Sequence, residues 1–140
     1  MKLFYTLFLT ISISMFFFSC SKKETNNDIV AEKLKGKWEA TSLKIDNTET
    51  FNPLVSKITT TFFDIEDNKG RYNLKIFFLD SLISEKEGNT EIISEGTKLT
   101  LDEDGNVLPT TVNIIELTDN LLMTKGIDQN GKEIIYSGSK

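Results

Sequence analysis

The 140-residue chain contains no histidine and only one cysteine, Cys20. Without histidine, it lacks the side chain that most often performs acid–base chemistry near neutral pH and most often binds metals. A single cysteine allows neither an internal disulfide nor a thiolate zinc site. These absences lead us to expect that the protein is not an enzyme and that it binds no metal or cofactor.

An excess of basic charge is missing as well. The chain has 16 Lys and Arg residues against 21 Asp and Glu residues, a net charge of −5. Nucleic-acid binding requires a basic face that displaces counterions, so we expect no nucleic-acid partner. Hydrophobic residues make up 39% and charged residues 26%, values that fit neither a disordered chain nor a polytopic membrane protein. The length then indicates one domain, which we expect to be monomeric.

Motifs of the common enzyme classes are also absent. There is no Gly-x-Ser-x-Gly nucleophile elbow and no glycine-rich phosphate loop between a strand and a helix. Asp102–Asn106 resembles the start of a calcium loop, but Val107, Leu108 and Pro109 occupy later positions that would need ligands. A hairpin turn is the better interpretation. No spacing selects a carboxylate pair for glycoside hydrolysis, although a hydrolase remains a third hypothesis.

The chain begins with an apolar leader. Lys2 supplies a positive start, and residues 3–18 are apolar apart from four Ser and Thr residues. This run is shorter than the roughly 20 residues needed to span a bilayer, and the composition becomes polar at Ser19. We therefore predict a signal peptide over residues 1–19, followed by a polar tether over residues 20–27.

Phe17-Phe18-Ser19-Cys20 resembles the lipobox of bacterial lipoproteins. In that family the cysteine sulfur receives a diacylglycerol, a peptidase cuts just before it, and the new amine is usually acylated. The aromatic residues before Ser19 are similar to the looser boxes of the Bacteroidota lineage. The resemblance implies lipidation at Cys20 and membrane attachment through acyl chains such as palmitate. The alternatives are an uncleaved signal anchor, or ordinary signal-peptidase cleavage with Cys20 incidental.

The tether also bears on localisation. Surface export of Bacteroidota lipoproteins resembles a process that uses acidic residues soon after the cysteine, whereas this chain has Ser21-Lys22-Lys23 there. We therefore expect an anchor in the outer membrane of the cell envelope that faces the periplasm.

Residues 28–140 have the pattern of one short helix followed by strands. Asn27 or Asp28 is a plausible N-cap for a helix over 29–35 that ends at Gly36. A change of apolar phase between Ala40 and Leu43 predicts a bulge in the first strand. Eight segments have strand patterns; they cover residues 37–45, 58–65, 71–79, 90–95, 98–101, 110–117, 121–126 and 133–137.

The connections between these strands favour a closed barrel. Most are short and carry Asn, Asp and Gly, which are typical of hairpin turns. Eight antiparallel strands gain most by closing, because closure removes exposed edges. The expected fold class is therefore all-β, a small antiparallel up-and-down eight-stranded barrel preceded by a short helix. Residues 46–55 form a longer connection, and residues 80–89 are expected to be a short helix, a loop or a flap over one barrel end.

Gly36-Lys37-Trp38 resembles the Gly-x-Trp signature of lipocalins. Residues 115–123 and 128–140 are similar to the last hairpins of small lipocalin-like lipoproteins of the Bacteroidota. The resemblance implies that Trp38 packs across the closed end of the barrel with a basic residue stacked on it. The only arginine, Arg71, lies on the third predicted strand, which leaves Lys140 as a partial substitute.

A barrel of this size is either filled by its own side chains or holds one small ligand. Phe62, Tyr72, Phe78 and Met123 are candidates either for lining such a cavity or for ordinary packing. The leading hypothesis is a membrane-anchored protein that binds a small apolar or amphipathic ligand. The alternative is an envelope module with a structural or protein-interaction role and no ligand.

Overall fold

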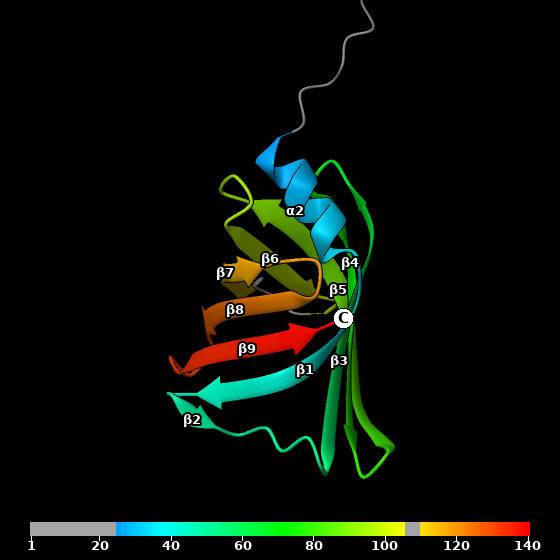
Figure 1. The fold of residues 1–140 in the computed structure, drawn as a ribbon, viewed down its shortest axis with the longest axis vertical. Helices are drawn as coiled ribbons and strands as arrows, with labels where there is room; N and C mark the ends of the chain where they lie inside the picture. Colours follow the sequence, from blue (N-terminus) through cyan, green and yellow to red (C-terminus); the bar gives the residue numbers. More distant parts are fainter. Residues whose placement is uncertain (1–24, 106–109) are drawn as a thin grey trace, which may run out of the picture.

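The computed structural model describes residues 25–105 and 110–140, which form a closed antiparallel β-barrel with a helix over one end (Figure 1). The predicted signal peptide and Cys20 lie outside the described residues. Within the described part of the chain, no helix has the length and apolar character to cross a membrane.

The predicted eight-stranded up-and-down barrel is confirmed. Its strands follow one another in the sheet in chain order, and β1 closes the barrel by pairing with β9. The short strand β2 only extends one end of β1. The strands are β1 (Gly36–Ile45), β2 (Thr48–Glu49), β3 (Ser56–Glu66), β4 (Lys69–Phe78), β5 (Ser81–Ile93), β6 (Lys98–Glu103), β7 (Thr110–Leu117), β8 (Leu121–Ile127) and β9 (Glu133–Ser139).

The helix, α2, spans Asn26–Leu34 and starts earlier than predicted. Its N-cap is Thr25, whose hydroxyl accepts from the backbone N–H of Asp28, while the Asp28 carboxylate accepts from the backbone N–H of Thr25 at 2.8 Å. This is a capping box with Asp in the place usually taken by Glu or Gln. The prediction that Asn27 or Asp28 caps the helix was therefore wrong by two to three residues.

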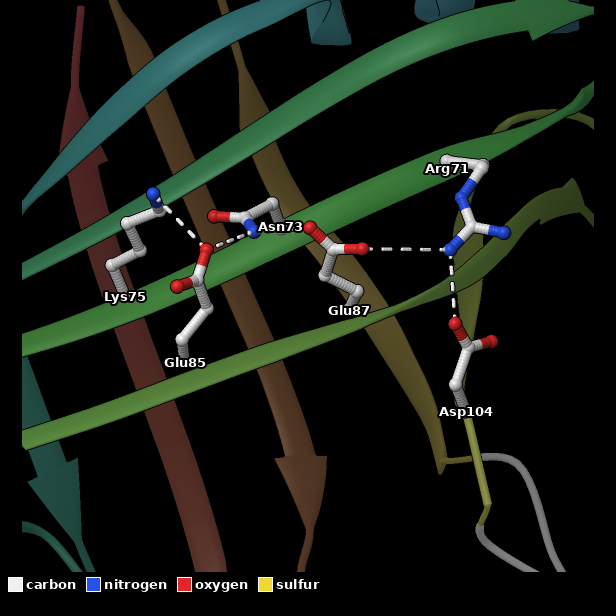
Figure 2. Close-up of polar contacts among 6 residues, drawn as sticks. All are labelled: Arg71, Asn73, Lys75, Glu85, Glu87 and Asp104. Atoms are coloured by element: carbon white, nitrogen blue, oxygen red, sulfur yellow. Dashed lines mark hydrogen bonds and ion pairs between the residues drawn. The ribbon is translucent and has the colours of Figure 1, made fainter.

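The segment 80–89 is neither a helix, a loop nor a flap. It forms the end of the turn after β4 and the first part of β5, which pairs with β4 from Ser81 onward with one register shift at Ile76 and Phe77. Polar side chains on the outer face of both strands stabilise this pairing (Figure 2). Asn73 donates to Glu85 and Glu87, and Lys75 forms an ion pair with Glu85 at 3.0 Å. A solvated outer face needs no apolar side chains, so the strand lacks the usual hydrophobic signal.

The predicted bulge in the first strand is confirmed. The register between β1 and β9 shifts between Ala40 and Ser42.

The hydrophobic core lies at the end of the barrel that α2 covers, and it includes Leu34, Trp38 and Phe62. The closed sheet, this core and the helix that covers it all lie within residues 25–140. This part of the chain therefore has a hydrophobic core of its own.

Candidate ligand-binding cavity

The barrel is closed at the end under α2. Trp38, the third residue of β1, is fully buried, and its indole N–H donates to the carbonyl of Leu34 at 2.8 Å. The hydrogen bond fixes the indole and satisfies a carbonyl in the last turn of the helix. The expectation that Trp38 plugs the closed end is thus confirmed.

Lys140 completes this end of the barrel. Its ammonium lies 4.6 Å from the centre of the Trp38 ring and donates to the carbonyl of Lys33 at 2.6 Å. The lysine thus takes the stacking position that the lipocalin resemblance assigns to a basic residue. Arg71 lies elsewhere, on the outer face of β4, where its guanidinium binds Asp104 at 2.9 Å (Figure 2).

A cavity of about 560 Å³ occupies the other half of the barrel. Its floor is the surface of the core that faces away from α2, formed by Phe62, Leu99 and Leu122. The strand ends farthest from α2 and the β8–β9 turn surround its opening. The volume lies within the range of roughly 300–1,000 Å³ that is typical of small-molecule sites.

The walls of the cavity are mainly apolar. Inward-facing positions of β1, β3, β4, β6, β7 and β9 contribute aliphatic side chains. These are Leu43, Ile58, Leu74, Ile76, Leu101, Val112 and Ile134. Such a surface favours an apolar ligand body, because burial removes apolar area from water without requiring polar partners.

A few hydroxyl groups interrupt this apolar wall. Thr60, Thr124, Tyr72 and Tyr136 all line the cavity. Burial, with help from the nearby carboxylates of Glu103, Asp102 and Asp104, raises the pKa of Tyr72 to about 12. The phenol is therefore neutral at physiological pH and can donate a hydrogen bond.

Tyr136, on β9, is partly buried, and its ring lies against Gly138. A Cβ at position 138 would lie 2.5 Å from the phenol oxygen, so the glycine makes room for the ring. Burial raises the pKa of Tyr136, an effect that the nearby Thr60 hydroxyl partly offsets. The phenol oxygen is buried without a hydrogen bond of normal geometry to any described residue. A buried hydroxyl in this state is a candidate partner for a polar ligand atom.

Two charged side chains also line the cavity near its opening. Lys86 on β5 and Glu103 on β6 form an ion pair of 2.9 Å between Nζ and Oε2. A third charged residue there, Asp128, accepts from the backbone N–H groups of Asn130 and Lys132, and these bonds lower its pKa. The sequence did not predict the Lys86–Glu103 pair, because the first part of β5, which carries Lys86, was not recognised as a strand.

Of the four residues predicted as candidates for the cavity lining, two line the cavity and two do not. Phe62 and Tyr72 line the cavity, as does Ile76. Met123 lies between the lining residues Leu122 and Thr124, so strand alternation places it on the outer face. Phe78, at the end of β4, is 46% exposed and lies outside the lining.

The described side chains of the acidic turn point to opposite sides of the barrel wall. Glu103 binds Lys86 inside the barrel, whereas Asp104 binds Arg71 outside it. Among the described residues, no three His, Cys, Asp or Glu side chains converge on a position where they could share one metal ion.

Large apolar side chains are exposed at the end of the molecule opposite α2. The hairpin between β4 and β5 extends there (Figure 1) and contacts the β2–β3 connection through a hydrogen bond from Leu79 N to Val55 O of 2.8 Å. The exposed residues are Leu54, Phe78, Leu79, Leu82 and Ile83.

Comparison with solved structures identifies the same fold. The redesigned β-barrel b11L5F_LGL superposes with a TM-score of 0.57 at 13% identity, covering 79% of this chain and 94% of its own. A second redesigned barrel, mFAP1, bound to DFHBI, gives 0.56 at 14% identity, covering 79% and 98%. Lobster apocrustacyanin A1 gives 0.52 at 19% identity, covering 82% and 68%. No family model and no curated protein matches the chain. At these identities the similarity shows the fold alone, which is lipocalin-like.

Proposed function

We propose that this protein is a lipid-anchored binding protein of the cell envelope that holds one small apolar or amphipathic molecule in its barrel. The observation that carries the proposal is the cavity of about 560 Å³, with its apolar wall and few hydroxyls. A barrel filled by its own side chains would have no room for a ligand. The mFAP1 barrel, which has the same fold, is bound to the small molecule DFHBI, and this supports the proposal.

A binding measurement tests the ligand hypothesis directly. The segment from Ser21 to Lys140 contains the barrel and its helix and can be produced without lipid. We expect native mass spectrometry of gently purified protein to detect a co-purifying small molecule, and an apolar fluorescent probe such as N-phenyl-1-naphthylamine to bind with one-to-one stoichiometry. Repeated recovery of empty protein that also fails to bind the probe would refute the proposal.

The anchor is a separate part of the proposal and has its own test. The predicted tether leads directly into α2, which covers the closed end of the barrel. An acylated Cys20 would thus hold the closed end toward the membrane and leave the opening facing away from it. We expect Cys20→Ala to move the protein from the membrane fraction to the soluble fraction, and Ser21→Ala to leave it membrane-bound. Membrane retention of the Cys20→Ala protein would contradict lipidation.

One observation favours the alternative of a protein-interaction module. Leu54 and Leu79, near the opening, are 89% and 64% exposed, and clusters of exposed apolar side chains often mark contact surfaces. If the barrel binds no small molecule in the tests above, this end of the molecule is where a partner would be sought.

A further inference from the structure

The inward direction of Lys86 follows from the polar network on the outside of the barrel. Glu85 and Glu87 face outward, where Glu85 pairs with Lys75 and Glu87 lies 3.9 Å from the guanidinium of Arg71 (Figure 2). Because side chains alternate along a strand, Lys86 between them must face the interior. A charged residue at an inward position is unusual for a barrel strand, since the outer face already offers solvated positions for charge.

Glu103 meets Lys86 from the neighbouring strand. Their side chains are 44% and 29% exposed, so the pair is partly in contact with water at the opening. Deeper in the cavity, the floor of Phe62, Leu99 and Leu122 carries no charge. The cavity therefore has two chemically distinct levels, an apolar interior and one positive and one negative group close together near the entrance.

This arrangement discriminates between ligand head groups by their charge. An anionic head group would be attracted by Lys86 but repelled by Glu103, and a cationic one would meet the reverse combination. A head group that carries both charges can pair its acidic group with the lysine and its ammonium with the glutamate. Asp128 adds a second negative charge near the opening, where its carboxylate accepts from two backbone N–H groups of the β8–β9 turn.

We propose that the cavity selects zwitterionic amphiphiles, with the apolar chain on the floor and the two charged groups of the head paired with Lys86 and Glu103. This inference rests on the proposed binding function and adds the ligand class. The protein and its entrance are acidic overall, so the order of affinity is zwitterion first, cation second and anion last.

The test compares amphiphiles that share a dodecyl chain and differ only in the head group. The probes are dodecylphosphocholine and dodecyl sulfobetaine as zwitterions, dodecyltrimethylammonium as cation and laurate as anion, all below their micelle concentrations and at low salt. Affinity for the Ser21–Lys140 segment is measured by displacement of N-phenyl-1-naphthylamine. At least one zwitterion should bind about tenfold tighter than either singly charged amphiphile, the difference expected for one charge-assisted hydrogen bond.

Three variants assign any preference to the ion pair. Lys86→Met keeps the length of the side chain and should reduce the preference for the zwitterion over the cation to less than about twofold. The exchange Lys86→Glu with Glu103→Lys should restore it. Lys75→Met is the matched control, because Lys75 forms a similarly exposed ion pair with Glu85 on the outer face. That variant should bind like the unmodified protein.

The outcomes separate the inference from the function on which it rests. If all four amphiphiles bind equally well and Lys86→Met changes nothing, the cavity binds ligands but the head-group inference is wrong. A change of the same size in Lys75→Met would also overturn it, since the effect would then come from overall charge. If neither the probe nor any amphiphile binds the unmodified protein, the proposed function fails together with the inference.

Discussion

The ammonium of Lys140, the last residue of the chain, lies 4.6 Å from the centre of the Trp38 ring, near the start of the first strand. The same ammonium donates to the carbonyl of Lys33, in the last turn of α2. The Lys140 side chain thus connects the C-terminal end of the barrel with the start of β1 and with the helix. The contact closes the end of the barrel that carries the buried core, and the opposite end is left for the cavity.

Removing this lysine should destabilise the closed end. We expect Lys140→Ala to lower the free energy of unfolding by about 1 kcal/mol, because it loses a cation–π contact and a cation at a helix C-terminus. Urea unfolding followed by Trp38 fluorescence measures this change. Lys132→Ala, at an exposed turn position, is the control and should have no measurable effect. Equal stability of both variants would show that the Lys140 contact contributes nothing.

Filling part of the cavity should weaken ligand binding and leave the fold intact. Thr124 faces the cavity, whereas its neighbour Met123 faces outward. We expect Thr124→Phe to weaken binding of N-phenyl-1-naphthylamine at least about tenfold, because the ring occupies space that an apolar ligand would fill. Met123→Phe introduces the same ring on the outer face and should leave the affinity unchanged. Thermal unfolding of both variants checks that the barrel is intact.

The sequence suggested a ligand cavity, but it identified only part of the lining, and the residues around the cavity show why. Alternation and turn chemistry predict which segments are strands, but the phase of a strand is ambiguous where the inward side chains are polar or small. In β5 the inward positions include Ser84, Lys86 and Gly88, so no apolar pattern identified the strand. In β8 the same ambiguity made Met123 a candidate in place of Thr124.

The closed end was easier to predict than the open end. Trp38 and Lys140 could be placed by resemblance, and their positions depend on a core that must be filled. Whether the rest of the interior is filled depends on the summed volume of inward side chains from eight strands. Small inward residues such as Thr60, Thr124 and Gly126 are the signal that could have indicated a void.

The two tyrosines of the barrel predict the response to alkali. Burial raises the pKa of both, to about 12 for Tyr72, so the folded state favours the neutral phenol. The stability this provides is fully present below the unfolded pKa of about 10 and is lost as pH rises through the folded pKa. A titration of the Ser21–Lys140 segment at 295 nm should show less tyrosinate at pH 10 than two exposed tyrosines would give, while the protein is folded. In Tyr72→Phe, stability should fall less steeply between pH 10 and 12. Ordinary ionisation of both tyrosines near pH 10 in folded protein would contradict the buried positions.

The turn between β4 and β5 holds Leu79 in a conformation that suits other residues better. Leu79 and Asp80 have φ angles of 46° and 63°, as in the turns formed by Asp46 and Asn47 or by Asp67 and Asn68. Among the described residues with positive φ, Leu79 is the only large apolar one, and it is 64% exposed. Its Cβ is strained in this region, and burial offers little compensation.

Replacing Leu79 with the residue that such turns prefer should therefore stabilise the protein. We expect Leu79→Asn to raise the free energy of unfolding by about 1 kcal/mol, because asparagine tolerates the left-handed region at lower cost. Leu82→Asn, at an exposed position of β5 outside the turn, is the control and should give no gain, since it relieves no strain. A loss of stability in Leu79→Asn would mean that the leucine makes contacts at the open end that outweigh its strain. A gain would show that the strained Leu79 beside the opening lowers the stability of the protein. Such a cost to stability is expected where a residue serves binding and not folding.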